Sequence, residues 1–117
     1  MKQYLGAKLV KAEPADKSGD PGYFIEYPDG YTSWSPKAVF EEAYREVSGL
    51  TYGLAQEAML KGFKVRCKQW VAGRFLEYVP ESEYKFPYIK ETFASGHVVM
   101  WLPNHIDLLT SEWEIIK

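Results

Sequence analysis

The sequence predicts an α+β fold in which an antiparallel β-sheet packs with two main helices and a short C-terminal helix. Short aromatic-rich or alternating segments recur along the chain, between turns that contain glycine or proline. Nine tyrosines, six phenylalanines and four tryptophans strengthen the strand signal, because aromatic residues favour strands. Two segments carry a helix-capping residue followed by apolar residues at helical spacing.

The first part of the chain predicts strands followed by one helix. The strands are residues 4–13 and 23–27, with turns at 15–22 and 28–30, the second of which leads into YTSWS. Ser35 can cap a helix and Pro36 suits its first position, so we expect a helix over residues 36–47. Its candidate buried residues are Ala38, Val39, Ala43 and Val47, or Phe40 and Tyr44.

A second helix and a run of strands fill the rest of the chain. Thr51 can cap a helix over about 52–61, and Gly62 supplies the left-handed residue that ends it. Its apolar stripe is Leu54, Ala55, Ala58 and Met59. Strands are expected at 63–70, 75–80, 88–93, 97–102 and 112–117, with a loop at 80–87 and turns at Gly73 and 94–96. Asn104 can cap a short helix over 106–110, in which Asp107 completes a capping box.

The length of 117 residues fits a single domain. We expect residues 1–48 to be a strand-strand-helix extension that packs on a core of residues 49–117, because a piece of about 48 residues would be marginally stable alone. The net charge of −2 supplies no overall field for DNA, RNA or an acidic membrane. No apolar run reaches the ~18 residues of a membrane helix, so we expect a cytoplasmic protein without these partners.

Catalytic and metal-binding patterns are weak in this sequence. His97 and His105 lack the helical spacing of a metal pair, and they form no known ligand pattern with Cys67. The single cysteine also excludes an internal disulfide, and we expect it to be a small core residue. No serine lies in a nucleophile elbow, and the glycines form no phosphate-binding loop. We therefore predict no catalytic residue, no metal and no cofactor.

Basic residues and a tryptophan alternate along the predicted strand at 63–70. Lys64, Arg66, Lys68 and Trp70 occupy every second position, so they would share one face of roughly 20 Å. A solvated strand face is the simpler interpretation of the charges. An exposed indole is costly in water, however, so Trp70 should be covered by another element, a second subunit or a ligand. Arginine binds phosphate oxygens through two donors and indoles stack on bases, so the pattern suggests a nucleotide site, to which Arg74 adds a further cation.

The segment at 101–113 offers complementary groups. Trp101 is a second possible stacking surface, and Asn104, Asp107 and Thr110 could bond to ribose hydroxyls or a base edge. The alternative roles are core packing for Trp101 and helix capping for Asn104 and Asp107. Trp113, in the last predicted strand, is assigned to the core.

The phrases LTYGLAQEAMLKGFKVRCKQW and VVMWLPNHIDLLTSEWE give residues 50–117 a recognisable order and spacing. This block resembles the phage anti-Thoeris signal-sponge family, second type. The resemblance implies a protein that binds cyclic nucleotide immune signals without cleaving them, above all cyclic ADP-ribose isomers made by TIR-domain enzymes. It also implies homotetramers with pockets at subunit interfaces, action in the cytoplasm of the infected bacterial host and, for some members, a separate pocket for cyclic dinucleotides.

The residues that lie in matching motifs are Tyr52, Arg66, Trp70, Trp101, Asn104 and Asp107. As a hypothesis, Arg66 meets the pyrophosphate with help from Lys68 or Arg74. Trp70 and Tyr52 stack on the base, Trp101 walls the pocket, and Asn104 and Asp107 bond to ribose hydroxyls or the base edge.

The first 48 residues depart from the shorter family members and resemble a module found on other small phage proteins, for which the sequence indicates no activity. Three alternative functions stay open. The protein could be an enzyme that degrades the same signals, a nucleic-acid module that uses the basic strand, or a phage structural or protein-interaction domain whose tryptophans bury a subunit interface.

Overall fold

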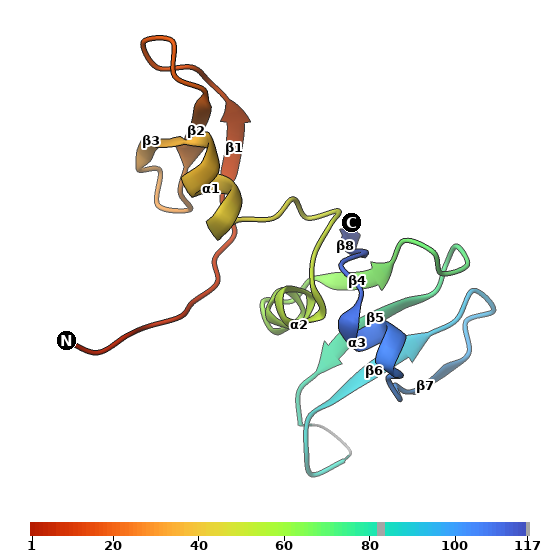
Figure 1. Cartoon of the computed structure of the whole chain (residues 1–117). Coiled ribbons are helices and arrows are strands. Elements are labelled where there is room, and N and C mark those ends of the chain that lie inside the picture. The colour runs from red at the N-terminus through yellow and green to blue at the C-terminus, as the bar shows by residue number, and fades with distance from the viewer. Residues whose placement is uncertain (82–83, 117) are drawn as a thin grey trace. The chain divides into compact units, whose positions relative to one another are not determined.

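The computed structural model describes residues 1–81 and 84–116 and divides the chain into two compact units, Met1–Arg45 and Glu46–Lys117 (Figure 1). The predicted α+β class is confirmed, and the strands belong to two antiparallel sheets rather than to one. The expectation of a single domain with an N-terminal extension stays a prediction. Within the described ranges, no helix is both long and apolar enough to cross a membrane.

The N-terminal unit is a three-stranded antiparallel sheet with one helix. Its elements are β1 (Lys11–Pro14), β2 (Gly22–Glu26), β3 (Thr32–Pro36) and α1 (Lys37–Ala43), and the strand order is β1-β2-β3. Ile25 is 2% exposed and Tyr23 stacks on Phe40 of α1, with 4.2 Å between ring centroids. The ring of Trp34 lies so close to the Gly22 backbone that any Cβ at that position would clash with it. A glycine is therefore required there.

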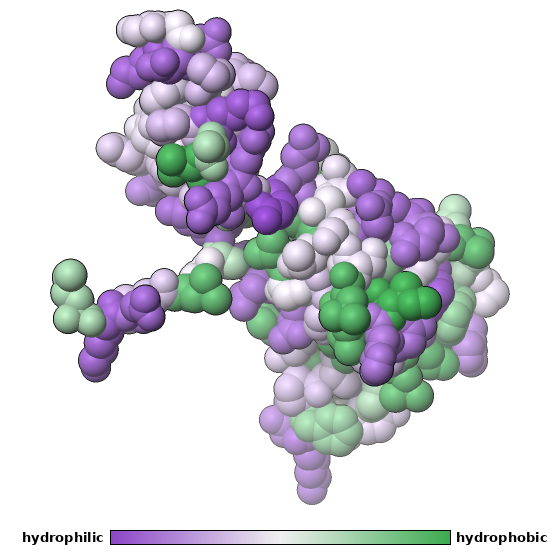
Figure 2. Space-filling model, viewed as in Figure 1, coloured by the Kyte–Doolittle hydropathy of each residue, from purple (hydrophilic) through white to green (hydrophobic). Residues whose placement is uncertain are grey.

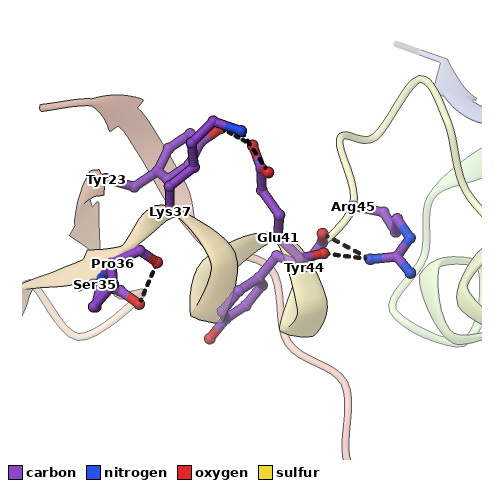
Figure 3. Close-up of polar contacts among 7 residues, drawn as sticks. All are labelled: Tyr23, Ser35, Pro36, Lys37, Glu41, Tyr44 and Arg45. Carbon is purple, nitrogen blue, oxygen red and sulfur yellow. Dashed lines mark hydrogen bonds and ion pairs between the residues drawn. The ribbon is translucent and has the colours of Figure 1, made fainter. Parts of the chain in front are cut away.

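Two predicted elements of this unit are shorter than expected. The strand expected at 4–13 begins only at Lys11, and the helix expected to reach residue 47 ends at Ala43. Ser35 does not cap α1, because it pairs with Tyr23 as part of β3. Figure 3 shows the other end of the helix, where the Arg45 guanidinium donates to the carbonyl oxygen of Glu41 at 2.7 Å.

The burial predicted for this helix is corrected in part. Ala38, Val39, Ala43 and Val47 are all exposed. The alternative pair is the half-buried one, since Phe40 stacks between Tyr23 and Tyr44. Because α1 has only seven residues, it covers the sheet with Phe40 and not with a full apolar stripe.

The C-terminal unit is a five-stranded antiparallel sheet of order β7-β6-β5-β4-β8. The strands are β4 (Lys64–Cys67), β5 (Phe75–Val79), β6 (Tyr88–Thr92), β7 (Val98–Met100) and β8 (Trp113–Ile116), and the helices are α2 (Tyr52–Leu60) and α3 (His105–Leu109). The end of the chain thus returns as β8, an edge strand of the sheet that pairs with β4 (Figure 1). Residues 82 and 83 of the predicted loop and Lys117 of the predicted last strand lie outside the described residues.

Local signals at both helices of this unit are confirmed. The Thr51 hydroxyl accepts the amide of Leu54 at 3.3 Å, and Gly62 ends the helix at φ 94°. Asn104 and Asp107 form the predicted capping box of α3. Two predicted strands are shorter than expected, since the one at 63–70 ends at Cys67 and the one at 97–102 is limited to Val98–Met100.

The core lies between α2 and one face of the five-stranded sheet. Strand register places one row of side chains across that face, and its members are Ile115, Val65, Leu76, Glu91 and Val99. The buried apolar residues are Leu50, Ala55, Ala58, Met59, Val65, Cys67, Leu76, Trp101 and Trp113. Three of the four residues of the predicted α2 stripe are among them, and Leu54 packs at their edge. Glu91 is the charged member of an otherwise apolar row.

Candidate functional site

The predicted face of three cations and an indole does not form. Lys64 and Arg66 alternate with the buried Val65 and Cys67, as expected for a strand. The chain then turns at residues 68–70, where the Trp70 amide donates to the Cys67 carbonyl at 3.1 Å. Trp70 therefore packs toward the core instead of sharing the outer face with Arg66. The expectation of an alternating surface up to Trp70 is wrong.

Arg66 holds this turn in place. Its guanidinium donates to the carbonyl oxygens of Trp70 and Val71. Its Nε atom is buried, and no partner for it exists in the described part of the chain. The Arg66 side chain is half-buried. The guanidinium predicted to bind phosphate therefore also links β4 to the turn.

The Arg74 guanidinium lies over the ring of Trp70. Its guanidinium carbon is 3.9 Å from the centre of the indole, a cation–π geometry. Its Nε donates to Glu91 Oε2 at 2.6 Å, and the Arg74 side chain is 31% exposed while that of Glu91 is 7% exposed. The sequence reasoning missed Glu91. The signal was available in YIKETF, because Ile89 and Glu91 alternate onto the same face.

Lys68 lies further out than the arginines. Its ammonium is 3.7 Å from Glu112 Oε2, and both side chains are largely exposed. Such an exposed pair contributes little to stability. Lys68 therefore keeps its charge available at the edge of the site.

Four aromatic rings form a continuous cluster centred on Trp113. The ring centroids of Tyr52, Trp70 and Trp101 lie 5.6, 5.2 and 5.8 Å from that of Trp113. Trp113 is 0% exposed, which confirms its assignment to the core, and its Nε1 donates to the Asp107 carbonyl at 2.8 Å. Trp101 is buried as well, and its Nε1 has no partner among residues 1–81 and 84–116. Burial raises the pKa of Tyr52, so its phenol stays neutral.

Asn104 and Asp107 are engaged with each other at the start of α3. The Asn104 Oδ1 accepts the Asp107 amide at 2.8 Å, and Asp107 Oδ2 accepts the Asn104 amide at 3.2 Å. Asp107 is buried, whereas Asn104 is exposed. The capping role that was the alternative interpretation is therefore present for both residues.

The structure brings the eight predicted residues into one neighbourhood. Tyr52, Trp70, Trp101 and Asp107 contact Trp113 directly. Arg66 and Arg74 both contact Trp70, and Asn104 contacts Asp107. The backbone amide of Lys68 donates to the carbonyl oxygen of Glu112, the residue before β8. We call this set with Glu91 the Trp113 site.

An open groove of about 530 Å³ belongs to the N-terminal unit. Its lining residues are Asp20, Pro21, Trp34, Pro36, Lys37, Ala38 and Glu41. Glu41 is held by Lys37 Nζ at 2.8 Å and by the Tyr23 hydroxyl at 2.7 Å, contacts that lower the pKa of its carboxyl (Figure 3). The predicted ligand-binding residues do not contribute to this groove.

Cys67 is a fully buried core residue, as predicted. Burial raises the pKa of its thiol to about 12; the Asp107 carboxylate adds to the rise, and the Arg74 and Arg66 guanidinium groups oppose it. The thiol therefore stays protonated near neutral pH and is a poor nucleophile. In the described residues, no group of three or more histidine, cysteine or acidic side chains is arranged to hold a metal ion.

The Cys67 thiol predicts an alkaline loss of stability. Its pKa in the unfolded chain is near 9 and in the folded protein about 12, so the unfolded state releases the proton first and unfolding becomes easier as pH rises from 9 toward 12. Between pH 8 and pH 11 this costs about 2–3 kcal/mol. Cys67→Ala should be less stable than wild type by about 1 kcal/mol at pH 8 but more stable at pH 11 in urea unfolding. Parallel pH profiles for the two proteins would contradict this.

The C-terminal unit defines a class of small α+β protein in which arginines adjoin a cluster of aromatic rings, the side chains that nucleotide-binding proteins use for phosphates and bases. Residues 50–116 match the family model described as the Thoeris anti-defense 2-like domain, and the chain belongs to this family. The resemblance inferred for residues 50–117 is confirmed. Membership implies that the chain acts against Thoeris by sequestering its signalling molecules. No curated protein matches the chain.

Proposed function

We propose that this protein binds a cyclic ADP-ribose isomer made by a TIR-domain enzyme and holds it intact at the Trp113 site. The observation that carries the proposal is the guanidinium of Arg74, which lies on Trp70 at 3.9 Å. Only its Nε is used inside the protein, and its two terminal nitrogens form no hydrogen bond with the described residues. These nitrogens match the oxygen spacing of a phosphate, and aromatic surface lies beside them for a base.

The required affinity is attainable for such a ligand. A sponge must act at nanomolar signal concentrations, which corresponds to about −12 kcal/mol. A ligand of about 35 heavy atoms at roughly −0.3 kcal/mol per atom reaches about −10 to −11 kcal/mol. A cyclic nucleotide is already rigid, so it loses little conformational entropy on binding, and enclosure in a pocket supplies the remainder.

Retention without cleavage is part of the proposal. Family membership supports it, because the family implies sequestration rather than turnover. Cys67, which pairs with Trp113 across β4 and β8, has a buried, protonated thiol that is a poor nucleophile. The roles of Tyr52, Asn104 and Asp107 toward base and ribose belong to the same proposal.

The proposal includes a homotetramer with its signal pockets at subunit interfaces and a second affinity for cyclic dinucleotides. Strongly exposed apolar side chains before and on α3 support self-association, with Leu102 86%, Ile106 70% and Leu109 83% exposed. Figure 2 shows apolar residues gathered at the place where Figure 1 draws α3. The site of action that we propose is the cytoplasm of the infected bacterial host.

A depletion assay tests the function. The protein, with its assembly state first read from gel filtration, is incubated with a panel of cyclic nucleotides and removed on a filter. We expect at least one cyclic ADP-ribose isomer to disappear from the filtrate and to reappear intact in chromatography after the protein is heated. Recovery of breakdown products would identify an enzyme instead. Self-association without depletion of any nucleotide would favour the interaction-domain alternative.

A further inference from the structure

Glu91 is a carboxylate placed inside the apolar core row. It lies on β6 directly across from Leu76 on one side and Val99 on the other, and the residue as a whole is 5% exposed. Glutamate is rarely buried unless it is paired, because a carboxylate loses its hydration on burial. Its partner is Arg74 Nε at 2.6 Å. A simple apolar residue would fill the same row without this cost, so the acid suggests a role beyond packing.

The contact fixes the plane of the Arg74 guanidinium. Glu91 holds the inner edge through Nε, while Trp70 supports the flat face at 3.9 Å. Because the group is planar, these two contacts together set the direction of the two terminal nitrogens. Those nitrogens are left without hydrogen bonds in the described part of the chain, at a side chain that is 31% exposed. The fork is thus oriented before any anion arrives.

We propose that Glu91 is a positioning residue that presents Arg74 to a phosphate or pyrophosphate group of the ligand. This rests on the function proposed for the Trp113 site and assigns the recognition of its diphosphate to the Glu91–Arg74–Trp70 stack. Because the Arg74 guanidinium is already oriented, less side-chain entropy is lost when the ligand binds. The ligand class is a nucleotide that carries adjacent phosphates.

The sign of the effect separates positioning from simple electrostatics. Removal of a negative charge near an anion site should strengthen binding if charge alone matters. If Glu91 positions Arg74, its removal weakens binding although the site becomes more positive. Glu91→Leu is the informative variant, because leucine suits the row between Leu76 and Val99 and should preserve folding.

The experiment measures binding by titration calorimetry with two probes, a cyclic ADP-ribose isomer and inorganic pyrophosphate. For Glu91→Leu we expect at least a tenfold loss of affinity for both probes. Glu91→Gln keeps an acceptor for Nε and should lie between wild type and Glu91→Leu. The double variant of Glu91→Leu with Arg74→Ala should bind no more weakly than Arg74→Ala alone, because Glu91 acts through Arg74.

A matched control is available on the opposite face of the sheet. Glu77 pairs with Lys90 at 3.1 Å, so Glu77→Leu removes a partnered strand carboxylate that does not contact Arg74. We expect its affinity to equal that of wild type. Equal or tighter binding by Glu91→Leu would overturn the positioning role while leaving the proposed function intact. If the wild-type protein binds neither probe, the proposed function is overturned and this inference with it.

Discussion

Replacing Trp113 by alanine is expected to unfold the C-terminal unit under conditions in which the wild-type protein is folded. Trp113 is 0% exposed and contacts three other aromatic rings within 6 Å. Deleting a buried aromatic side chain of this size costs about 3–5 kcal/mol. The Asp107 carbonyl would also lose the indole donor at 2.8 Å. A loss of this size is comparable to the whole stability of a small domain, about 5 kcal/mol or slightly more.

Urea unfolding followed by far-ultraviolet circular dichroism measures this loss. Trp113→Phe keeps most of the ring contacts but removes the donor, so its midpoint should lie between those of wild type and the alanine variant. Val71→Ala is the control, because Val71 is 75% exposed and keeps its backbone carbonyl in the variant, so it should change stability by no more than about 0.5 kcal/mol. A Trp113→Ala midpoint close to that of wild type would show that the aromatic cluster does not organise this core.

Capping residues predicted the two helices of the C-terminal unit well. Thr51 caps the start of α2, Gly62 follows its end, and Asn104 with Asp107 caps the start of α3. These N-terminal caps depend on residues only three positions apart, so the sequence shows them directly. The same reasoning failed at Ser35. There the pairing of β3 with β2 places Ser35 opposite Tyr23, and this strand contact outweighs the local capping preference.

The membership of the site was easier to predict than its geometry. Alternation correctly predicts Cys67 as a core residue, and the assignment of Trp113 to the core is confirmed as well. The turn after Cys67 could not be read from the alternating pattern, and it rotates Trp70 toward Trp113. Alternation in YIKETF indicates the face of Glu91 but not its partner, because Arg74 is 17 positions away and the two residues meet through the pairing of β5 with β6. Contacts made by strand pairing carry little local signal.

Replacing Arg66 by alanine is expected to weaken binding of the cyclic ADP-ribose isomer by about 3 kcal/mol, or more than a hundredfold, with the protein still folded. The guanidinium donates to the carbonyl oxygens of Trp70 and Val71, so its loss frees the turn that carries Trp70. The variant also loses a fork near the proposed pyrophosphate position. Isothermal titration calorimetry gives the affinity, and circular dichroism reports the fold.

Two further variants separate the geometry of the Arg66 guanidinium group from its charge. Lys64→Ala removes the neighbouring exposed cation of β4, which lies over Phe75 at 4.7 Å, and it should leave affinity almost unchanged. Arg66→Lys keeps the charge but loses the planar guanidinium group. If Arg66→Lys binds as weakly as Arg66→Ala, the shape of the guanidinium group, and not its charge alone, is the essential contribution. Recovery of affinity in Arg66→Lys would assign it to charge, and unchanged affinity in Arg66→Ala would remove Arg66 from the site.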